Sequence, residues 1–341
     1  MLRSISHDFQ APRLFGAVAT SSGGAASFGS FGDSFSSPTS GATGKVTMTP
    51  KAGFRRAPIC VCTSNWNNIA ANGGGYIDGN PTAASLTVGT HSGGAGAGDD
   101  GTLNALMLGY MSGDAVRGRV RGFDLGGQFD RPKLYLFKVT PATPALNIGN
   151  YHGTLAKTGT GDVTITFNEP FGNDAVTAVA TPILGTRAEI HASASKGSVR
   201  VKVFANGVAS DTPFYLAVYG SASLAYSRAE GLVVTPSNKP RLIAGVITYS
   251  GGVPSVSVGT GAFTLTDTGT GDVAVAFTDP FAREPIVVAS PTSATLVTVK
   301  AAATSSGFSL THFTAAGVAG DPSALHFLAF GSDDSAEYKY P

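Results

Sequence analysis

The chain has 341 residues, and its 23 Lys and Arg nearly balance its 22 Asp and Glu. Only 13% of the residues are charged, about half the usual share, and no basic stripe with interleaved aromatic residues occurs, which excludes nucleic acid as a favoured partner. No run of about eighteen apolar residues is present, so we expect no membrane insertion.

The chain begins with an arm, residues 1–11, that lacks the apolar core of a secretory signal. We therefore expect the protein to be made in the cytoplasm without a signal peptide. Copies of one pattern follow. The heptapeptide at residues 161–167 returns without a gap at residues 271–277, each time followed by a Pro-Phe pair, and a fainter copy begins at Gly44. A period of roughly a hundred residues is typical of tandem domains that each have a core.

Each copy opens with a Pro-basic-Leu element and closes on an aromatic-rich strand, in which Tyr110, Tyr219 and Phe330 are expected to correspond. Short segments rich in Arg, Gly or polar residues join the copies. The closing strands are expected at residues 106–112, 214–221 and 325–332. The expected organisation is an N-terminal arm (1–11), domain 1 with long Gly-rich loops (12–116), a linker (117–131), domain 2 (132–226), a linker (227–239), domain 3 (240–334) and a C-terminal tail (335–341).

Alternating apolar residues predict the central strand of each copy. In the second copy Val163, Ile165 and Phe167 alternate with polar residues, which is the period of a strand with one buried face. The first copy has Pro50 where the others have Phe, so we expect its strand to end early or to bulge at an edge. No segment has the spacing of an amphipathic helix over three turns. The sequence therefore predicts an all-β fold of three tandem antiparallel β-sandwich domains that arose by internal triplication.

No set of residues has the spacing of a catalytic or metal centre. Cys60 and Cys62 lie two residues apart on an expected strand, where a disulfide between them would be strained, so we expect reduced thiols. The six histidines occupy unrelated contexts, and we interpret them as structural. We therefore expect no enzyme activity, no metal and no cofactor.

The sequence Gly-Thr-Gly-Asp occurs at residues 159–162 and 269–272. It precedes a strand, whereas a phosphate-binding loop needs a helix N-terminus after its glycines. We interpret it as a turn in which Gly takes a positive φ and the Asp carboxylate accepts hydrogen bonds from nearby backbone N–H groups. The Pro-Phe pair that follows is expected to form a corner whose ring closes the end of the sandwich.

The first copy contains an insertion rich in Asn and Gly that holds the only Trp of the chain. An indole ring can stack on a sugar, and Asn side chains can bind its hydroxyls. The candidate ligand-binding residues are Asn65, Trp66, Asn67 and Tyr76. The alternative is that Trp66 anchors a long loop or an intersubunit contact.

A Val-x-Phe, Phe, Pro-x-Val succession is formed in the third copy by Val275, Phe277, Phe281, Pro285 and Val287. With the aromatic strand at residues 327–330, it resembles the H-type lectin pattern and its relatives in phage receptor-binding and other virion proteins. Residues 330–334 also resemble the C-terminal ends of some tailed-phage structural proteins. The resemblance implies six-stranded antiparallel sandwiches, often trimeric, that bind sugars. The chain lacks the Trp usual in the closing strand of these lectins, so what the resemblance implies is mainly the fold and the phage setting.

Low charge and this resemblance together predict a non-enzymatic structural protein of a bacteriophage particle, exposed on the virion in the tail fibre, tail tip or baseplate region. Neutral faces bury easily against neighbours, so the expected partners are other virion proteins and further copies of the chain, with a trimer favoured. Exposed loops are candidates for contact with a host-surface glycan. The alternatives are a capsid decoration or head-fibre protein and a glycan-binding lectin-type adhesin.

Overall fold

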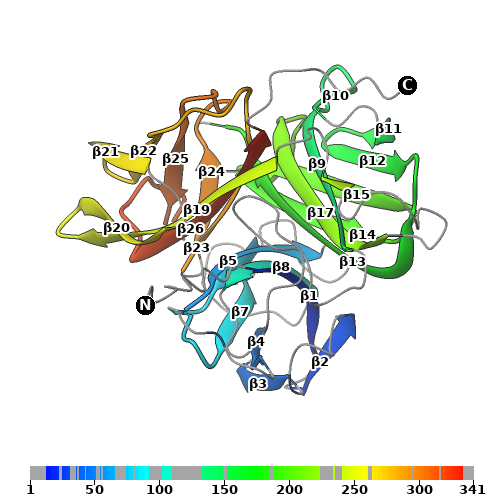
Figure 1. Ribbon diagram of the computed structural model, residues 1–341, viewed down its shortest axis with the longest axis horizontal. Coiled ribbons are helices and arrows are strands. Elements are labelled where there is room, and N and C mark those ends of the chain that lie inside the picture. Colours follow the sequence, from blue (N-terminus) through cyan, green and yellow to red (C-terminus); the bar gives the residue numbers. More distant parts are fainter. Residues whose placement is uncertain are drawn as a thin grey trace, which may run out of the picture.

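The computed structural model describes residues 13–22, 25–30, 36, 38–42, 44–50, 54, 57–65, 74–79, 81–91, 102–109, 132–148, 152–184, 188–222, 233–234, 240–259, 263–292, 295–314 and 316–332. These residues form strands and turns and contain no helix, so the all-β class is confirmed. Figure 1 shows the strands gathered in three groups around a common centre.

Three units of eight main strands follow one another along the chain. Unit 1 contains β1 (Arg13–Ser22), β2 (Ala25–Ser30), β3 (Thr39–Ala42), β4 (Lys45–Met48), β5 (Ile59–Asn65), β6 (Gly74–Ile77), β7 (Leu86–His91) and β8 (Thr102–Gly109). Unit 2 contains β9 (Pro132–Thr140), β10 (Ala145–Ile148), β11 (Gly153–Gly159), β12 (Asp162–Phe167), β13 (Phe171–Pro182), β14 (Ala188–Ala194), β15 (Ser198–Ala205) and β17 (Phe214–Ala222), with the short β16 (Val208–Ala209) and β18 (Val233–Val234) beside them. Unit 3 contains β19 (Pro240–Ser250), β20 (Val253–Gly259), β21 (Phe263–Gly269), β22 (Asp272–Phe277), β23 (Ile286–Pro291), β24 (Leu296–Val299), β25 (Gly307–Phe313) and β26 (Ala324–Ser332).

Each unit contains two sets of four antiparallel strands, and the strand order within a set is the same in all three units. The inner sets have the orders β2-β1-β8-β5, β10-β9-β17-β13 and β20-β19-β26-β23, and the outer sets have the orders β3-β4-β7-β6, β11-β12-β15-β14 and β21-β22-β25-β24. The outer set of unit 2 and the inner set of unit 1 are joined by a parallel pairing of β14 with β5, so these two sets belong to one nine-stranded sheet that also includes β16. The lectin resemblance implied six strands per sandwich, whereas the described residues of each unit form eight main strands. Periodicity does not reveal the additional edge strands, since a strand such as β10 is short and mostly half-buried.

The predicted central strands are observed as β4, β12 and β22, and β4 ends at Met48, two residues before Pro50. The closing strand of the first copy, expected at residues 106–112, begins earlier, at Thr102 of β8, and residues 110–112 lie outside the described residues. Leu108 of β8 pairs with Leu14 of the opening element, just as Tyr219 pairs with Leu134 and Phe330 pairs with Leu242 in the other units. Leu108 is therefore the residue equivalent to Tyr219 and Phe330. Because unit 1 has Leu where the others have an aromatic ring, the aromatic pattern indicated the wrong register. The expected arm, the first linker, most of the second linker and the tail lie outside the described residues.

The central strands of the inner sets are buried on both faces. On β5, Cys60 and Cys62 belong to the core of unit 1, whereas Ile59 and Val61 belong to a second core shared with units 2 and 3. Every residue of β23 is buried. Because both faces are covered, these strands are almost continuously apolar and lack the period of two. The neutral faces of one unit are therefore buried against the other units of the same chain.

Two sequence motifs meet at a corner of the sandwich. Phe171, from the Pro-Phe pair, is buried in unit 2. The Lys133 ammonium, from the Pro-basic-Leu element, lies 5.5 Å from the Phe171 ring centroid and donates a hydrogen bond to the carbonyl oxygen of Glu169. Arg241 lies 4.2 Å from the Phe281 ring in unit 3. The corner ring is thus buried as predicted, and it also makes a cation–π contact with the opening element.

The Gly-Thr-Gly-Asp segments are turns, but their hydrogen bonds differ from the prediction. Gly161 has a φ of +66°, and its N–H donates to the Asp211 carboxylate at 2.8 Å. The Asp162 carboxylate accepts no backbone N–H from the described residues of the turn; it pairs with Arg200 at 2.6 Å on the neighbouring strand β15. The expected role of this Asp was wrong because residue 162 is already part of β12, so a cross-strand partner is closer than the turn. Unit 3 repeats the arrangement at Gly271.

Replacing Gly271 with Ala should destabilise the protein by about 2 kcal/mol or more. The φ of Gly271 is +77°, and a Cβ there would lie 2.6 Å from the Gly320 nitrogen and 2.8 Å from the His312 carbonyl oxygen. Thermal unfolding measures the effect. Gly197→Ala is the matched control, since a Cβ at this turn position meets nothing within 4 Å. Equal losses of stability in the two variants would contradict the conclusion that the turn requires glycine at position 271.

Candidate functional site: the seam between the three units

A seam where all three units meet is built around three hydroxyl side chains. Thr63, Thr181 and Ser290 occupy equivalent positions on β5, β13 and β23, since each pairs with the equivalent residue of the closing strand. Each hydroxyl oxygen contacts both the backbone N–H and the carbonyl oxygen of one residue in another unit. Thr63 Oγ1 lies 2.9 Å from the Ala180 nitrogen and 3.3 Å from its carbonyl oxygen. The corresponding distances are 2.8 and 3.4 Å from Thr181 to Ala289, and 2.8 and 3.1 Å from Ser290 to Cys62. The contacts run from unit 1 to 2, 2 to 3 and 3 to 1. We call this closed set the hydroxyl ring.

The hydroxyl ring is buried, since its six residues are at most 6% exposed. Buried backbone N–H and C=O groups need hydrogen-bond partners, and a hydroxyl is the smallest side chain that both accepts and donates. One Ser or Thr therefore satisfies both groups of its neighbour. This accounts for the hydroxyl side chain at this position in each unit.

The residues paired with the hydroxyls on the closing strands also contact the next unit. The Asn104 amide donates to the carbonyl oxygen of Ala192 at 2.9 Å. The Tyr215 hydroxyl accepts the Ala303 N–H at 2.7 Å. His326 Nδ1 accepts the N–H of Cys60 at 3.2 Å. Like the hydroxyl ring, these contacts join unit 1 to unit 2, unit 2 to unit 3 and unit 3 to unit 1, although the three side chains differ chemically.

Among the described residues, an ion pair reinforces the junction between units 2 and 3 and neither of the other two junctions. The Tyr215 hydroxyl donates a hydrogen bond to the Glu284 carboxylate at 2.5 Å, and Lys138 Nζ lies 2.7 Å from the same carboxylate. Burial is the largest cause that raises the pKa of Tyr215, and the hydrogen bond to Glu284 is the next largest. The phenol therefore stays protonated. The junction between units 2 and 3 therefore contains a part-buried ion pair.

His326 is the buried titratable group at the junction of units 3 and 1. Because Nδ1 accepts a backbone N–H, the neutral ring carries its proton on Nε2. Nε2 has no hydrogen-bond partner among the described residues. Burial lowers the pKa of His326 to about 3, since an imidazolium here would lose its hydration.

A small cavity lies at the seam. Its volume is about 30 Å³, room for a water molecule but not for a larger ligand. It is lined by residues of all three units: Cys62, Thr63, Gly75, Ala180, Pro182, Ala188, Ile190, Ala289, Ser290, Pro291, Thr295, Leu296 and Val297. The seam is therefore a packed junction and not a substrate pocket.

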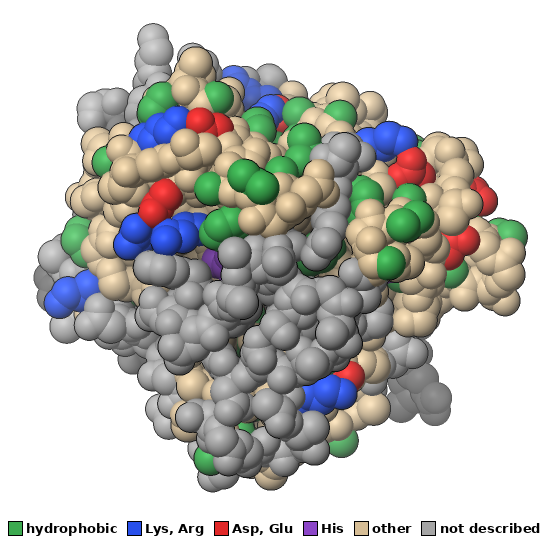
Figure 2. Space-filling view, turned by 180° about the vertical axis from the view of Figure 1, so that it is seen from behind, with side chains coloured by type: hydrophobic (Ala, Val, Ile, Leu, Met, Phe, Trp, Pro, Cys, Tyr) green, Lys and Arg blue, Asp and Glu red, His purple; other side chains and the backbone are tan. Residues whose placement is uncertain are grey.

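A repeated surface loop went unnoticed in the sequence. The pattern x-Gly-Val-Ala-x-Asp occurs at residues 206–211 and 316–321. Val208 is 69% exposed and Val318 is 65% exposed, and the glycine before each has a φ of +78°. The repeated Gly-Val-Ala was the signal that could have revealed it. Units 2 and 3 thus each present an apolar tip to solvent. On the face in Figure 2, charged side chains are sparse, and many blue patches lie beside red ones.

The predicted ligand-binding residues are not brought together by the described part of the chain. Tyr76 lies on β6, is 3% exposed, and has its ring against Gly89. Burial raises its pKa. Asn65 ends β5, and its side chain, like all of Trp66 and Asn67, lies outside the described residues. The glycan site stays a prediction that rests on the sequence of the insertion.

The cysteines and histidines form no reactive centre within the described ranges. Cys60 and Cys62 are free and buried, and burial raises the pKa of Cys62 to about 12, so its thiol stays protonated. His191 contacts the Ser64 hydroxyl at 2.6 Å. No group of three or more His, Cys, Asp or Glu that could hold a metal occurs among the residues that the structure describes.

The fold and the seam define an all-β protein in which three sets of sheets are joined by equivalent polar contacts. Comparison with protein-family models, curated protein sequences and solved structures finds no match to this chain. In the described part of the chain, no helix has the length and apolarity needed to cross a membrane.

Proposed function

We propose that the chain is an internal triplication of one β-sandwich domain and serves as a non-enzymatic structural protein of a bacteriophage particle, exposed in the tail fibre, tail tip or baseplate region. The observation that carries this proposal is the hydroxyl ring. Because its contacts run from unit 1 to 2, from 2 to 3 and from 3 back to 1, one chain resembles a trimer whose subunits have been joined end to end.

Three equivalent units around one centre suit a protein that docks on a symmetric assembly. Each unit can offer the same kind of surface to one repeat of the partner, so one favourable contact is made several times. The central strands of the inner sets, buried on both faces, supply a rigid body for this purpose. The exposed tips at Val208 and Val318 repeat between units, and such tips suit contact with other virion proteins.

The experiment that tests location is mass spectrometry of purified particles together with imaging of particles carrying a labelled copy of the chain. The proposal expects the chain in particles and the label on the tail. Label on the head would favour the capsid-decoration or head-fibre alternative. Absence from purified particles would overturn the structural role.

The oligomeric state is part of the proposal, and light scattering of the purified chain measures it. A homo-oligomer, with three copies favoured, is expected from the low charge of the surface. A monodisperse monomer of 34.4 kDa would contradict that expectation, and the trimer-like arrangement would then be confined to one chain.

A glycan-binding adhesin is the second candidate, favoured by the Asn-flanked Trp66 that directly follows β5. A glycan array probed with the natural chain and with Trp66→Ala tests it. Binding that the substitution removes would support the adhesin. No binding, or equal binding by both chains, would remove it.

A further inference from the structure

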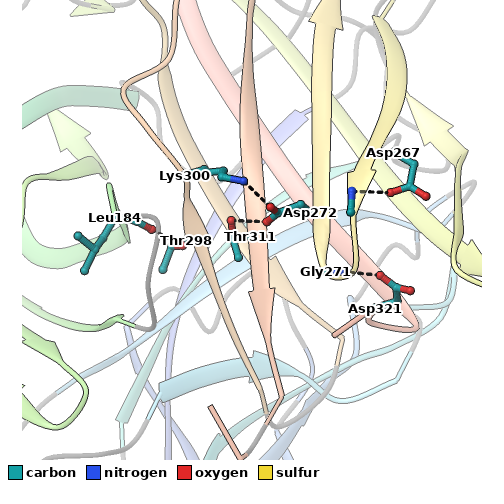
Figure 3. A network of polar contacts seen from close by, with 9 residues as sticks. Leu184, Asp267, Gly271, Asp272, Thr298, Lys300, Thr311 and Asp321 are labelled. Carbon is teal, nitrogen blue, oxygen red and sulfur yellow. Dashed lines mark hydrogen bonds and ion pairs between the residues drawn. The ribbon is translucent and has the colours of Figure 1, made fainter. Parts of the chain in front are cut away.

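The outer turns of units 2 and 3 are built alike and differ in one charged position. In unit 2 the Asp211 carboxylate accepts the Gly161 N–H through Oδ1 at 2.8 Å. In unit 3 the Asp321 carboxylate accepts the Gly271 N–H through Oδ1 at 2.6 Å (Figure 3). Each Asp closes an x-Gly-Val-Ala-x-Asp loop. In both turns the second oxygen, Oδ2, is left for another partner.

In unit 2 that partner is an ammonium group. Lys157 Nζ lies 2.5 Å from Asp211 Oδ2. Strand register places Asp267 at the equivalent position of unit 3, since Lys157 pairs with Val163 on β12 and Asp267 pairs with Val273 on β22. Unit 3 has therefore exchanged the cation of this pair for a second carboxylate.

The exchange leaves a negatively charged notch. Asp267 and Asp321 line a surface cavity of about 410 Å³ with Gly251, Gly252, Val253, Gly269 and Thr270. Asp267 uses Oδ1 to accept the Gly269 N–H at 3.0 Å, as Figure 3 shows. No ion pair joins either carboxylate to a Lys or Arg within the described ranges. Two like charges at one cavity repel each other unless a cation lies between them.

A buried hydroxyl lies in the field of the same carboxylates. The Tyr249 oxygen is buried and has no hydrogen-bond partner among the described residues. Burial, and then the charges of Asp321, Asp267 and Asp272, raise the pKa of Tyr249. The phenol stays neutral, and its oxygen has unused capacity to accept a hydrogen bond.

We propose that this notch binds a primary ammonium group, the side chain of a lysine on a partner protein. Unit 2 shows the contact that is missing, since it places a lysine ammonium on the equivalent carboxylate. A metal ion fits less well, because Asp267 and Asp321 are two protein ligands and no third His, Cys, Asp or Glu joins them within the described ranges. This inference stands independently of where in a particle the chain resides.

The test uses the full chain, labelled with ¹⁵N, and Nα-acetyl-lysine methylamide as the probe, with the norleucine analogue as a control that lacks the ammonium. In the natural chain, the lysine probe should shift the Gly269 and Gly271 amide signals in the millimolar range, whereas the norleucine probe should not. Asp267→Lys, which copies unit 2, should abolish the response and raise the melting midpoint by about 1–3 °C.

The reciprocal variant keeps the proposal falsifiable. Lys157→Asp should create a second notch, in which the Gly161 amide begins to respond to the lysine probe. No response in the natural chain, an equal response to the norleucine probe, or a response to Ca²⁺ with none to the lysine probe would overturn the proposal. A response that survives Asp267→Lys would also overturn it, because the new ammonium should occupy the site.

Discussion

Replacing Thr181 with Val should lower the free energy of unfolding by about 3 kcal/mol and the melting midpoint by roughly 5–10 °C. Val has nearly the same shape but cannot exchange hydrogen bonds, so the N–H and C=O of Ala289 would lose their partner inside the seam. Each buried backbone group left without a partner costs about 1–3 kcal/mol. Thermal and urea unfolding measure the loss.

Two control variants separate the hydroxyl from the shape of the side chain. Thr181→Ser keeps the hydroxyl and copies unit 3, where Ser290 performs the same role, so it should retain most of the stability. Thr266→Val makes the same chemical change at an exposed position of β21 and should alter stability by less than about 0.5 kcal/mol. If Thr181→Val behaved like Thr266→Val, the hydroxyl ring would not hold the units together.

Acidification from pH 7 to pH 5 should destabilise the protein, and His326 should account for about 2 kcal/mol of the loss. Its pKa is about 3 in the folded state against an ordinary value of 6.5. Below pH 6.5 the unfolded chain takes up a proton at this residue and the folded chain does not. Stability is therefore fully present above pH 6.5 and is lost progressively as the pH falls toward 3. His152, whose pKa burial lowers to about 4, acts in the same direction.

The variant His326→Asn measures how much of the stability lost on acidification is due to His326. The Asn side-chain oxygen can accept the N–H of Cys60 in place of Nδ1, as a neutral residue that does not titrate, and Asn104 already occupies the equivalent position of unit 1. Urea unfolding at pH 7 and pH 5 should show a drop about 2 kcal/mol smaller in the variant than in the natural chain. The same drop in both would mean that His326 is not the group that titrates.

Part of the fold could be predicted because it depends on residues that are close in sequence. The alternation of Val163, Ile165 and Phe167 predicted β12, and all three are buried. Gly161 has the positive φ expected for its turn. The corner at Phe171 is buried as expected. Each of these outcomes requires information from only a few neighbouring residues.

The hydroxyl ring could not be predicted in this way. Thr63 and its partner Ala180 lie 117 residues apart, and Ser290 and Cys62 lie 228 residues apart. A single Thr or Ser in a strand is ordinary, and nothing local distinguishes it from an exposed one. The same limit explains Tyr76, which was placed in a binding loop by composition and lies buried on β6.

The amino-acid sequence by itself determined the all-β class, most of the strands and the conformation of the repeated turns, since backbone preferences and side-chain alternation act over a few residues. The tertiary structure decided which strands are covered on both faces, which unit each hydroxyl contacts, and that Asp267 and Asp321 line one cavity. These depend on the positions of strands far apart in the chain, because buried polar groups and like charges obtain or lose their partners only when the units are packed together.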